Sequence, residues 1–328
     1  MKRYGNLYET LCSWENLSLA YRKALKGARK NRETQEWYYH YEPKIIELRE
    51  SLLNHSYEPA AYRYFTIIDP KERVIAVAPF RDRIVHHALV NLLEPIYEAR
   101  FIHDSYATRK GKGTHKAIDR AQFFLRKNRW FFKADIEKYF DNIQHDILLQ
   151  LLENKIKDKA LLALTAKIVR NGGENGKGLP IGNLTSQFFA NVYLHPLDIY
   201  VQNELHICVY LRYMDDFVLF SRSKGMLKKQ GMAIRRFLRE TLGLSVKEKA
   251  TFFNQAANGL SFLGTRIFPA RIRIKNENLK RILKGIKRSL HLWAQNRVSW
   301  QSFFDSLNSR WAHLSKQHTL RLRQQMLG

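Results

Sequence analysis

The sequence predicts an α+β protein, because short apolar runs that end at turn residues are interspersed with longer stretches of helical period. The clearest strand-like run is "WFFKA" at 130–134. Near the C-terminus, apolar residues recur at helical spacing, at Leu279, Ile282, Leu283, Ile286 and Leu290. With 328 residues, 45% of them hydrophobic, the chain is long enough for two or three packed subdomains.

Helices and a hairpin are expected in the first hundred residues. Residues 14–55 are predicted to form two helices, with Pro43 at a break or in the first turn of the second. In "YRYFTIIDPKERVIAVAP", two β-rich runs flank a turn signal, which predicts a hairpin with Lys71 and Arg73 near its tip. Residues 81–99 are expected to be helical, and "SYATRKGKGTHKAI" to be a basic loop that leads into a further helix.

The middle of the chain is predicted to alternate strands, loops and helices. A buried strand ends at Asp135, and a helix and the Gly-rich loop "NGGENGKGLPIGNL" follow it. A long helix is then expected, entered through Thr185 and Ser186 as capping residues. "ICVYLRY" and "FVLFSRS" are predicted strands on either side of Met214-Asp215-Asp216. A helix over 226–241 and a strand in "GLSFLGTRIF" come before a small helical module with a cationic surface.

The charge balance points to a polyanionic partner. The chain has 56 Lys plus Arg against 30 Asp plus Glu, a formal charge of +26, and so much self-repulsion is best tolerated on nucleic acid. No apolar run approaches the ~20 residues of a spanning helix. Two cysteines, Cys12 and Cys208, exclude a disulfide framework and a Cys-based metal cluster, and the N-terminus lacks an apolar signal core, so a cytoplasmic location is expected.

Two acidic positions indicate chemistry. Asp215-Asp216 lies in a turn between strands, where an acidic pair alone is common. Asp135, however, ends an apolar strand about eighty residues earlier. If both strands belong to one sheet, Asp135 and Asp215 can face each other at neighbouring strand ends, and hard divalent cations require such oxygen ligands. A pair of Mg²⁺ ions ~3.5–4 Å apart supports in-line phosphoryl displacement.

"YMDD" between strands, preceded by "ADIEKYF", resembles the catalytic core of a reverse transcriptase, over roughly residues 60–268. The resemblance implies an RNA-directed DNA polymerase with two Mg²⁺ ions (or Mn²⁺), dNTP substrates, and template RNA with its RNA–DNA duplex as partners. It also implies a right-hand polymerase fold. Its expected divisions are a helical extension over 1–60, fingers over 61–130, a palm over 131–268 with a fingers insertion around 150–180, and a helical thumb over 269–328.

The same resemblance assigns the candidate site residues. The catalytic residues are Asp135, Asp215, Asp216 and Lys249, with Lys247 as the alternative to Lys249. The metal ligands are Asp135, Ile136, Asp215 and Asp216. The dNTP-binding residues are Lys71, Arg73, Phe140, Ile181, Gly182 and Gln187, with Phe140 as the gate against a ribose 2′-hydroxyl. The template and primer residues are Arg109, Lys110, Lys112, Tyr213, Met214, Leu263, Gly264, Lys284, Lys287 and Arg288.

One departure from the family's usual motif indicates which type of reverse transcriptase this sequence resembles. Most reverse transcriptases carry Gln-Gly-x-x-x-Ser-Pro where this chain has Ile181 to Gln187, with Ile at the first position and Gln at the last. That pattern is similar to the reverse transcriptases of diversity-generating retroelements, which copy a template RNA with errors at adenines. Membership would imply a small, basic, oligomeric accessory variability protein as a partner, and a bacterial, archaeal or phage origin.

Two alternatives stay open. One is a compact bacterial reverse transcriptase of the retron or group II intron type. The other is a non-catalytic RNA-binding protein, whose phosphate contacts would need only the basic charge. A chain without catalysis has no need of a carboxylate cluster that repels itself without metal, which argues against the second.

Overall fold

The computed structural model describes residues 3–26, 31–68 and 72–315. Their contacts divide the chain into two compact units. Unit 1 comprises residues 1–103, 136–206 and 233–247, and unit 2 comprises residues 104–135, 207–232 and 248–328. The chain therefore crosses between the units several times, and each unit is assembled from segments far apart in the sequence. None of the described helices is both long and apolar enough to cross a bilayer.

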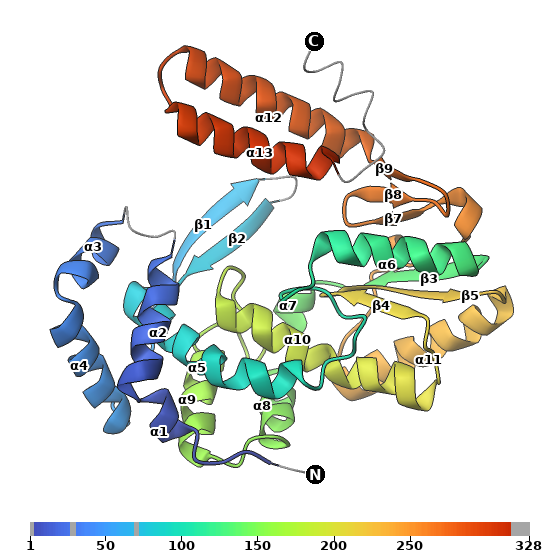
Figure 1. Cartoon of the computed structure of the whole chain (residues 1–328). Helices are drawn as coiled ribbons and strands as arrows, with labels where there is room; N and C mark the ends of the chain where they lie inside the picture. Colours follow the sequence, from blue (N-terminus) through green and yellow to red (C-terminus); the bar gives the residue numbers. More distant parts are fainter. Residues whose placement is uncertain (1–2, 27–30, 69–71, 316–328) are drawn as a thin grey trace. The chain divides into compact units, whose positions relative to one another are not determined.

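Unit 1 is mainly helical and carries a two-stranded hairpin (Figure 1). Its helices are α1 (Tyr8–Leu11), α2 (Trp14–Leu25), α3 (Arg32–Tyr39), α4 (Tyr41–Leu53), α5 (Phe80–Glu98), α7 (Tyr139–Asn142), α8 (His145–Glu153), α9 (Lys159–Arg170) and α10 (Leu184–Ile199), followed by a short π-helix at Tyr200–Glu204. Strands β1 (Arg63–Ile68) and β2 (Glu72–Val77) pair antiparallel, which confirms the predicted hairpin. All six residues of β1 are exposed.

The N-terminal helices of unit 1 have identifiable causes. Helix α2 begins where the Ser13 side chain accepts the Asn16 N–H, and the Asn16 amide in turn donates to the Leu11 and Ala88 carbonyls, which joins α2 to α5. The expected break near Pro43 falls at His40, between α3 and α4, and Pro43 lies in the first turn of α4.

Unit 2 is built on a four-stranded antiparallel sheet in the order β4-β5-β3-β6. Its strands are β3 (Trp130–Asp135), β4 (Tyr210–Tyr213), β5 (Asp216–Ser221) and β6 (Phe252–Gln255). One face of this sheet packs against α6 (Thr114–Lys127) and a second, three-stranded sheet. The second sheet contains β7 (Leu260–Phe262), β8 (Thr265–Ile267) and β9 (Ile272–Ile274). Short 3-10 turns at Glu248–Ala250 and Ala256–Asn258 flank β6.

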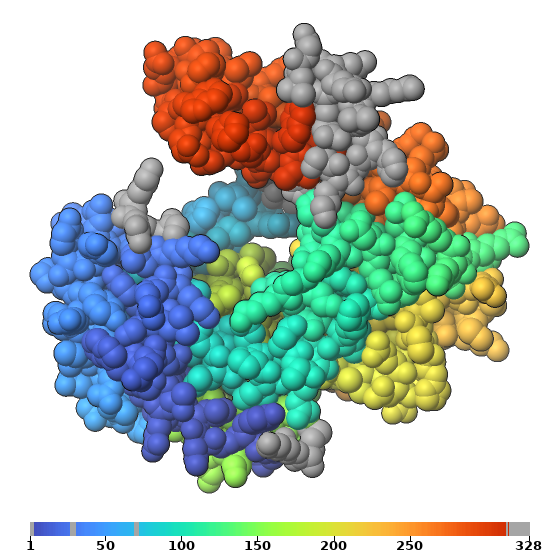
Figure 2. Space-filling model, viewed as in Figure 1, coloured from blue at the N-terminus to red at the C-terminus, as the bar shows by residue number. Residues whose placement is uncertain are grey.

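The opposite face of the four-stranded sheet is covered by α11 (Lys224–Leu242), whose first nine residues belong to unit 2. A Cβ built on Gly231 of this helix would lie 3.2 Å from the Phe253 ring and 3.3 Å from the Phe132 ring, so the glycine allows a close approach to the sheet. Helices α12 (Asn276–Ala294) and α13 (Trp300–Ser315) lie side by side at the C-terminal end of the described chain (Figures 1 and 2).

Several local predictions were wrong. The described part of residues 14–55 contains three helices, α2, α3 and α4, where two were expected, and three helices, α7, α8 and α9, follow β3 where one was expected. Thr185 and Ser186 do not cap α10, since the helix begins at Leu184 with Asn183 as its N-cap and both residues are buried inside it. "GLSFLGTRIF" is two strands rather than one, because Leu263 and Gly264 both adopt positive φ (46° and 79°) and form the turn between β7 and β8. The two cysteines are free, Cys12 buried and Cys208 exposed.

Candidate active site

The four-stranded sheet of unit 2 brings acidic residues from distant parts of the chain together. In the antiparallel register of β3 and β5, Asp135 is the direct partner of Asp216, and Lys133 is the partner of Val218. Directly opposed side chains in a sheet lie on the same face, and side chains two apart along a strand share that face. Lys133, Asp135 and Asp216 therefore project on one face, the face that also contributes Phe131 and Val218 to the core with α6.

Asp215 lies in the turn that joins β4 to β5. Tyr213 pairs with Asp216, so the hairpin loop consists of Met214 and Asp215 alone. Met214 has a φ of 56°, an uncommon conformation for a residue with a Cβ. The guanidinium of fully buried Arg212 donates to the Met214 carbonyl at 3.0 Å and so supports this turn.

Of the three aspartates at the strand ends, Asp216 has a carboxyl with a clearly raised pKa. Burial raises the pKa of its carboxyl to about 7, the ammonium of Lys133 acts to lower it, and the neighbouring Asp135 and Asp215 add to the increase. Nζ of Lys133 lies 3.1 Å from Oδ2 of Asp216. Oδ1 of Asp216 is buried and has no hydrogen-bond partner in the described part of the chain. One carboxylate oxygen is therefore paired and the other is left unsatisfied.

These residues fit a divalent cation in their chemistry. Hard cations take carboxylate oxygens, and an unsatisfied buried oxygen directly across the sheet from a second carboxylate provides such donors. Within residues 3–26, 31–68 and 72–315, no three His, Cys, Asp or Glu side chains are already gathered as a metal cluster. Ile136, the other predicted ligand, is buried and forms an isolated bridge with Val246 in unit 1.

The predicted dNTP-binding residues lie in unit 1. Lys71 lies outside the described residues, and Arg73 is exposed on β2. Phe140 is partly buried in α7, and its carbonyl accepts the Leu179 N–H at 2.8 Å. Gln187, in the first turns of α10, is partly buried.

Ile181 and Gly182 are fixed against the hairpin. The Ala76 N–H donates to the Ile181 carbonyl at 2.8 Å. Gly182 has a φ of 118°, and a Cβ there would lie 2.9 Å from the Ala76 carbonyl oxygen and 2.8 Å from the Ile75 side chain, so the position requires glycine. The glycine thus allows the loop to lie against β2, beside the hydrogen bond that holds the Ile181 backbone.

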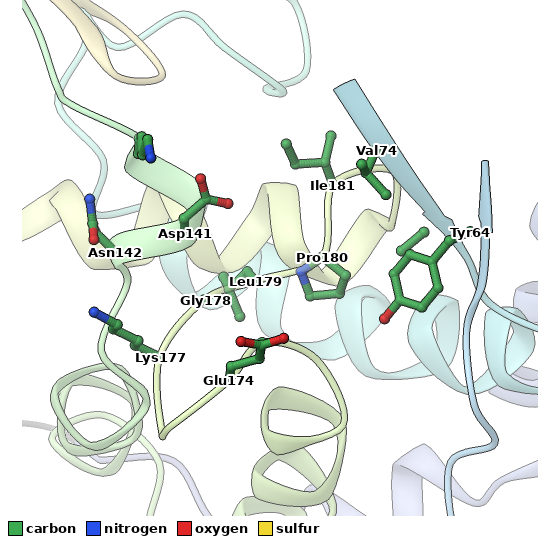
Figure 3. A pocket seen from close by; sticks show the side chains of 13 residues that line it. Tyr64, Val74, Asp141, Asn142, Glu174, Lys177, Gly178, Leu179, Pro180 and Ile181 are labelled. Atoms are coloured by element: carbon green, nitrogen blue, oxygen red, sulfur yellow. The ribbon is translucent and has the colours of Figure 1, made fainter. Parts of the chain in front are cut away.

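A cavity of about 550 Å³ lies beside Ile181 (Figure 3). Tyr64 and Val74 of the hairpin, Asp141 of α7, and Pro180 line it together with Ile181. The structure therefore brings Ile181 to a cavity shared by the hairpin and α7. Arg73, Phe140, Gly182 and Gln187 do not line this cavity.

The predicted template and primer residues fall on several parts of unit 2. Arg109 donates to the Ser105 carbonyl at 2.9 Å, the Lys112 ammonium lies 5.1 Å from the Tyr106 ring centre, and Lys110 is exposed in the same loop. The Tyr213 hydroxyl is 3.1 Å from Oγ1 of Thr114, at the start of α6. Of the two lysines predicted as catalytic alternatives, Lys249 is exposed in a 3-10 turn of unit 2 and Lys247, in unit 1, is partly buried.

The remaining template and primer residues lie towards the C-terminus. Leu263 and Gly264 form the β7–β8 turn, where the Gly264 carbonyl accepts from the Asn278 amide at 2.8 Å. Lys284, Lys287 and Arg288 are exposed on α12, as are Lys280 and Arg281 of the same helix.

Sequence reasoning missed two residues of this site. Lys133 stands two positions before Asp135, and the period of a strand alone places both on one face, but only the register with β5 reveals its ion pair with Asp216. Arg212 stands in an apolar strand, and a buried arginine in such a run is a signal that it satisfies a local polar group.

Residues 62–267, more than half of the chain, match the family model described as reverse transcriptase (RNA-dependent DNA polymerase). The chain is 26% identical over 272 residues to protein YkfC of Escherichia coli K12, a match that covers 69% of this chain and 71% of that protein. It is 34% identical over 170 residues to the group II intron-encoded protein LtrA of Lactococcus lactis, covering 49% of this chain and 28% of LtrA.

Among solved structures, telomerase from Candida tropicalis in complex with a fragment of telomeric RNA is similar, with a TM-score of 0.52 and 14% identity. That match covers 81% of this chain and 56% of the telomerase chain, and it establishes the likeness of fold alone. It confirms the expected right-hand polymerase fold. The match of residues 62–267 to the family model establishes that the chain belongs to the reverse transcriptase (RNA-dependent DNA polymerase) family.

Proposed function

We propose that this RNA-directed DNA polymerase makes error-prone, adenine-mutagenised cDNA from a template RNA in a diversity-generating retroelement, the copying step of mutagenic retrohoming. The observation that carries the proposal is Ile181. An aliphatic residue stands where most members of the family carry glutamine, and its side chain lines the cavity between the hairpin and α7.

The physical argument concerns a missing polar contact. The Ala76 N–H donates to the Ile181 carbonyl and so holds the Ile181 backbone. The Ile181 side chain lines the cavity and offers no hydrogen-bonding group. A glutamine there would help to fix the sugar or base of an incoming nucleotide. Each ~1.4 kcal/mol of lost discrimination raises misincorporation about tenfold, so one lost hydrogen bond is enough to change fidelity.

Catalysis is proposed for the carboxylates of unit 2. Asp135, Asp215 and Asp216 would hold Mg²⁺, with the backbone of Ile136 as a further ligand. Bound there, the ions would activate a primer 3′-hydroxyl and neutralise charge on the triphosphate leaving group. Lys249 is proposed as the acid that protonates pyrophosphate, and Lys71 and Arg73 as cations for the triphosphate. Phe140 is proposed to exclude the 2′-hydroxyl.

The proposed partners follow from charge and family. Template RNA and its duplex with cDNA would contact exposed cations of unit 2, including those of α12 at Lys284, Lys287 and Arg288. A small, basic, oligomeric accessory variability protein is the proposed protein partner, in a cytoplasmic setting. These partners belong to the retroelement proposal and stand or fall with it.

Primer extension on an RNA template tests the role of Ile181. Ile181→Gln should lower misincorporation opposite template adenine about tenfold, because it restores one polar contact. Ile181→Leu is the matched control, since it keeps an aliphatic side chain and should keep the error spectrum. An unchanged spectrum in Ile181→Gln would remove Ile181 from the explanation of fidelity.

A group II intron-type or retron-type reverse transcriptase is the second candidate. The likeness to LtrA over 49% of the chain is compatible with the group II type. Sequencing the cDNA made from the RNA of the native locus separates the candidates. Errors concentrated at template adenines support the retroelement, whereas faithful copies of an intron or of a structured noncoding RNA support the alternative. For a non-catalytic RNA-binding protein, incorporation would be absent in the wild type and in Asp215→Ala alike.

A further inference from the structure

A basic cleft lies in unit 2 at the end of the sheet opposite the carboxylates. Its volume is about 540 Å³, and it is formed where α6 ends, β3 begins and β5 ends. Its lining residues are Leu125, Arg126, Lys127, Asn128, Arg129, Arg222, Gln255, Ala256, Ala257 and Pro269. Four of these are cationic and none is acidic, so the cleft concentrates one sign of charge.

Contacts within the protein account for two of the four cations, Arg126 and Lys127. Arg126 and Lys127 lie in the last turn of α6, where cations are favoured by the helix dipole. Arg126 donates to the Pro269 carbonyl at 2.9 Å and to the Gln122 side chain at 3.2 Å. The Lys127 ammonium lies 4.3 Å from the centre of the Phe123 ring. These two residues are accounted for by the fold.

Arg129 and Arg222 are not accounted for in that way. Neither lies in a helix, and both are exposed. Among the described residues, neither guanidinium has a hydrogen-bond or ion-pair partner. Arg129 comes directly before Trp130 and Arg222 directly after Ser221, and Trp130 pairs with Ser221, so the register of β3 and β5 brings the two arginines to neighbouring strand ends. Two adjacent unpaired cations repel each other unless an anion lies between them.

The chemistry of the cleft fits a phosphodiester. A guanidinium presents several N–H donors in a planar fork that matches phosphate oxygens. The amides of Asn128 and Gln255 line the same cleft and supply neutral donors. Leu125, Ala256 and Pro269 give it apolar walls, against which a sugar can pack.

We infer that this cleft binds the phosphate backbone of a nucleic-acid strand outside the polymerisation site, through Arg129 and Arg222. It lies at the Trp130 end of β3, whereas Asp135 is at the other end, about 17 Å away at the rise of a β-strand. A strand held there is anchored without occupying the catalytic carboxylates. This inference rests on the proposed function, because that function is the reason to identify the bound polyanion as a nucleic acid.

The test uses the full chain and two matched double variants. Arg129→Gln with Arg222→Gln removes both unpaired guanidinium groups. Lys228→Gln with Lys229→Gln removes the same charge from exposed positions of α11 that do not line the cleft. Fluorescence anisotropy measures the affinity of each protein for a labelled RNA hairpin and for the same hairpin in DNA, over a series of salt concentrations.

The double variant Arg129→Gln, Arg222→Gln should bind both hairpins about tenfold more weakly at low salt. The slope of its log affinity against log salt should be smaller by about 2, because two phosphate contacts are lost. The lysine pair should leave both quantities near the wild type. Equal losses for RNA and DNA are expected, since phosphate contacts carry no information on sugar or base.

Extension of a short primer on a short RNA template keeps failure of this inference distinct from failure of the proposed function. Such a short substrate needs only the proposed catalytic carboxylates, so the variant without Arg129 and Arg222 should extend the primer like the wild type. If the wild type extends the primer but the arginine pair binds both hairpins with wild-type affinity and slope, the cleft is not a nucleic-acid site. If the wild type extends nothing, the proposed polymerase activity itself fails.

A site for a free small anion is the remaining alternative. Inorganic phosphate would then protect the wild type, but not the arginine pair, against thermal unfolding, while the salt slope for the hairpins stays the same in both proteins. That combination would overturn the inference.

Discussion

Nζ of Lys133 lies 3.1 Å from Oδ2 of Asp216, on the strand and face that also present Asp135. The ammonium thus occupies a position beside the carboxylates that a divalent cation is proposed to bind. In the metal-free protein it offsets part of the negative charge that burial makes costly. Lys133 therefore has an electrostatic role in the site although no sequence motif pointed to it.

Lys133→Met should raise the pKa of Asp216 further above its usual range, because the one neighbour that acts to lower it is removed while burial is unchanged. Carbon-detected NMR titration of the side-chain carboxyls in metal-free protein measures this, with Asp216→Asn to assign the signal. Lys133→Arg keeps the charge and is the control. An Asp216 pKa that is unchanged in Lys133→Met would show that the ion pair is absent in solution.

Asp135→Asn and Asp215→Asn should each lower Mg²⁺-dependent dNTP incorporation on a primed RNA by about a thousandfold or more, since each removes a charged oxygen donor from the proposed ion site. Thermal unfolding followed by circular dichroism should show no loss of stability, because fewer negative charges remain at the strand ends. The matched control is Asp146→Asn, a carboxylate at the start of α8 in unit 1. Wild-type incorporation by Asp135→Asn would exclude this residue from catalysis.

Gly182→Ala should lower the free energy of unfolding by about 3 kcal/mol, because its Cβ would collide with the Ala76 carbonyl and the Ile75 side chain at a φ of 118°. Urea denaturation measures the change. Gly176→Ala is the matched control, since Gly176 also has positive φ (73°) but nothing lies within 4 Å of its Cβ position, and about 1 kcal/mol is expected there. Equal losses in the two variants would mean that crowding against β2 has no part.

Because His86 is buried in its neutral form, we expect the folding stability of the protein to fall at acid pH. Burial, with help from His87 and Arg83, lowers the pKa of His86 to about 3, and its Nε2 has no hydrogen-bond partner in the described chain. A folded-state pKa below the unfolded value of about 6.5 means that the neutral form stabilises the fold. That stability is present above pH 6.5 and is lost as the pH falls from there towards the folded-state pKa.

Denaturation of His86→Phe over a pH series tests this prediction. The variant should show a flatter decline of unfolding free energy below pH 6.5, because it lacks the proton that the unfolded wild type binds at His86. His206→Asn, a change at an exposed position of unit 1, should follow the wild type. A wild-type slope in His86→Phe would assign the acid sensitivity to other groups.

Local patterns in the sequence predicted the elements that local physics decides. The paired strands β1 and β2, the buried strand that ends at Asp135 and the turn at Met214-Asp215 are all present, since turn residues and strand period mark them in the sequence. The opposition of Asp135 and Asp216 depends on pairing between strands about eighty residues apart, which no local signal encodes. The β7–β8 turn was missed because Leu263 adopts a positive φ that its residue type rarely takes. The roles of the site residues themselves stay predictions.

The register of β3 against β5 makes this part of the chain intolerant of length changes. Deleting or inserting one residue in β3 would turn Asp135 to the opposite face, where Phe132 packs beneath α11, and would remove Phe132 from its packing against Phe253. Catalytic competence and folding would then be lost in a single event. Variants with one residue deleted or inserted within residues 130–135 should accordingly be insoluble when expressed, and none should be a stable but inactive protein.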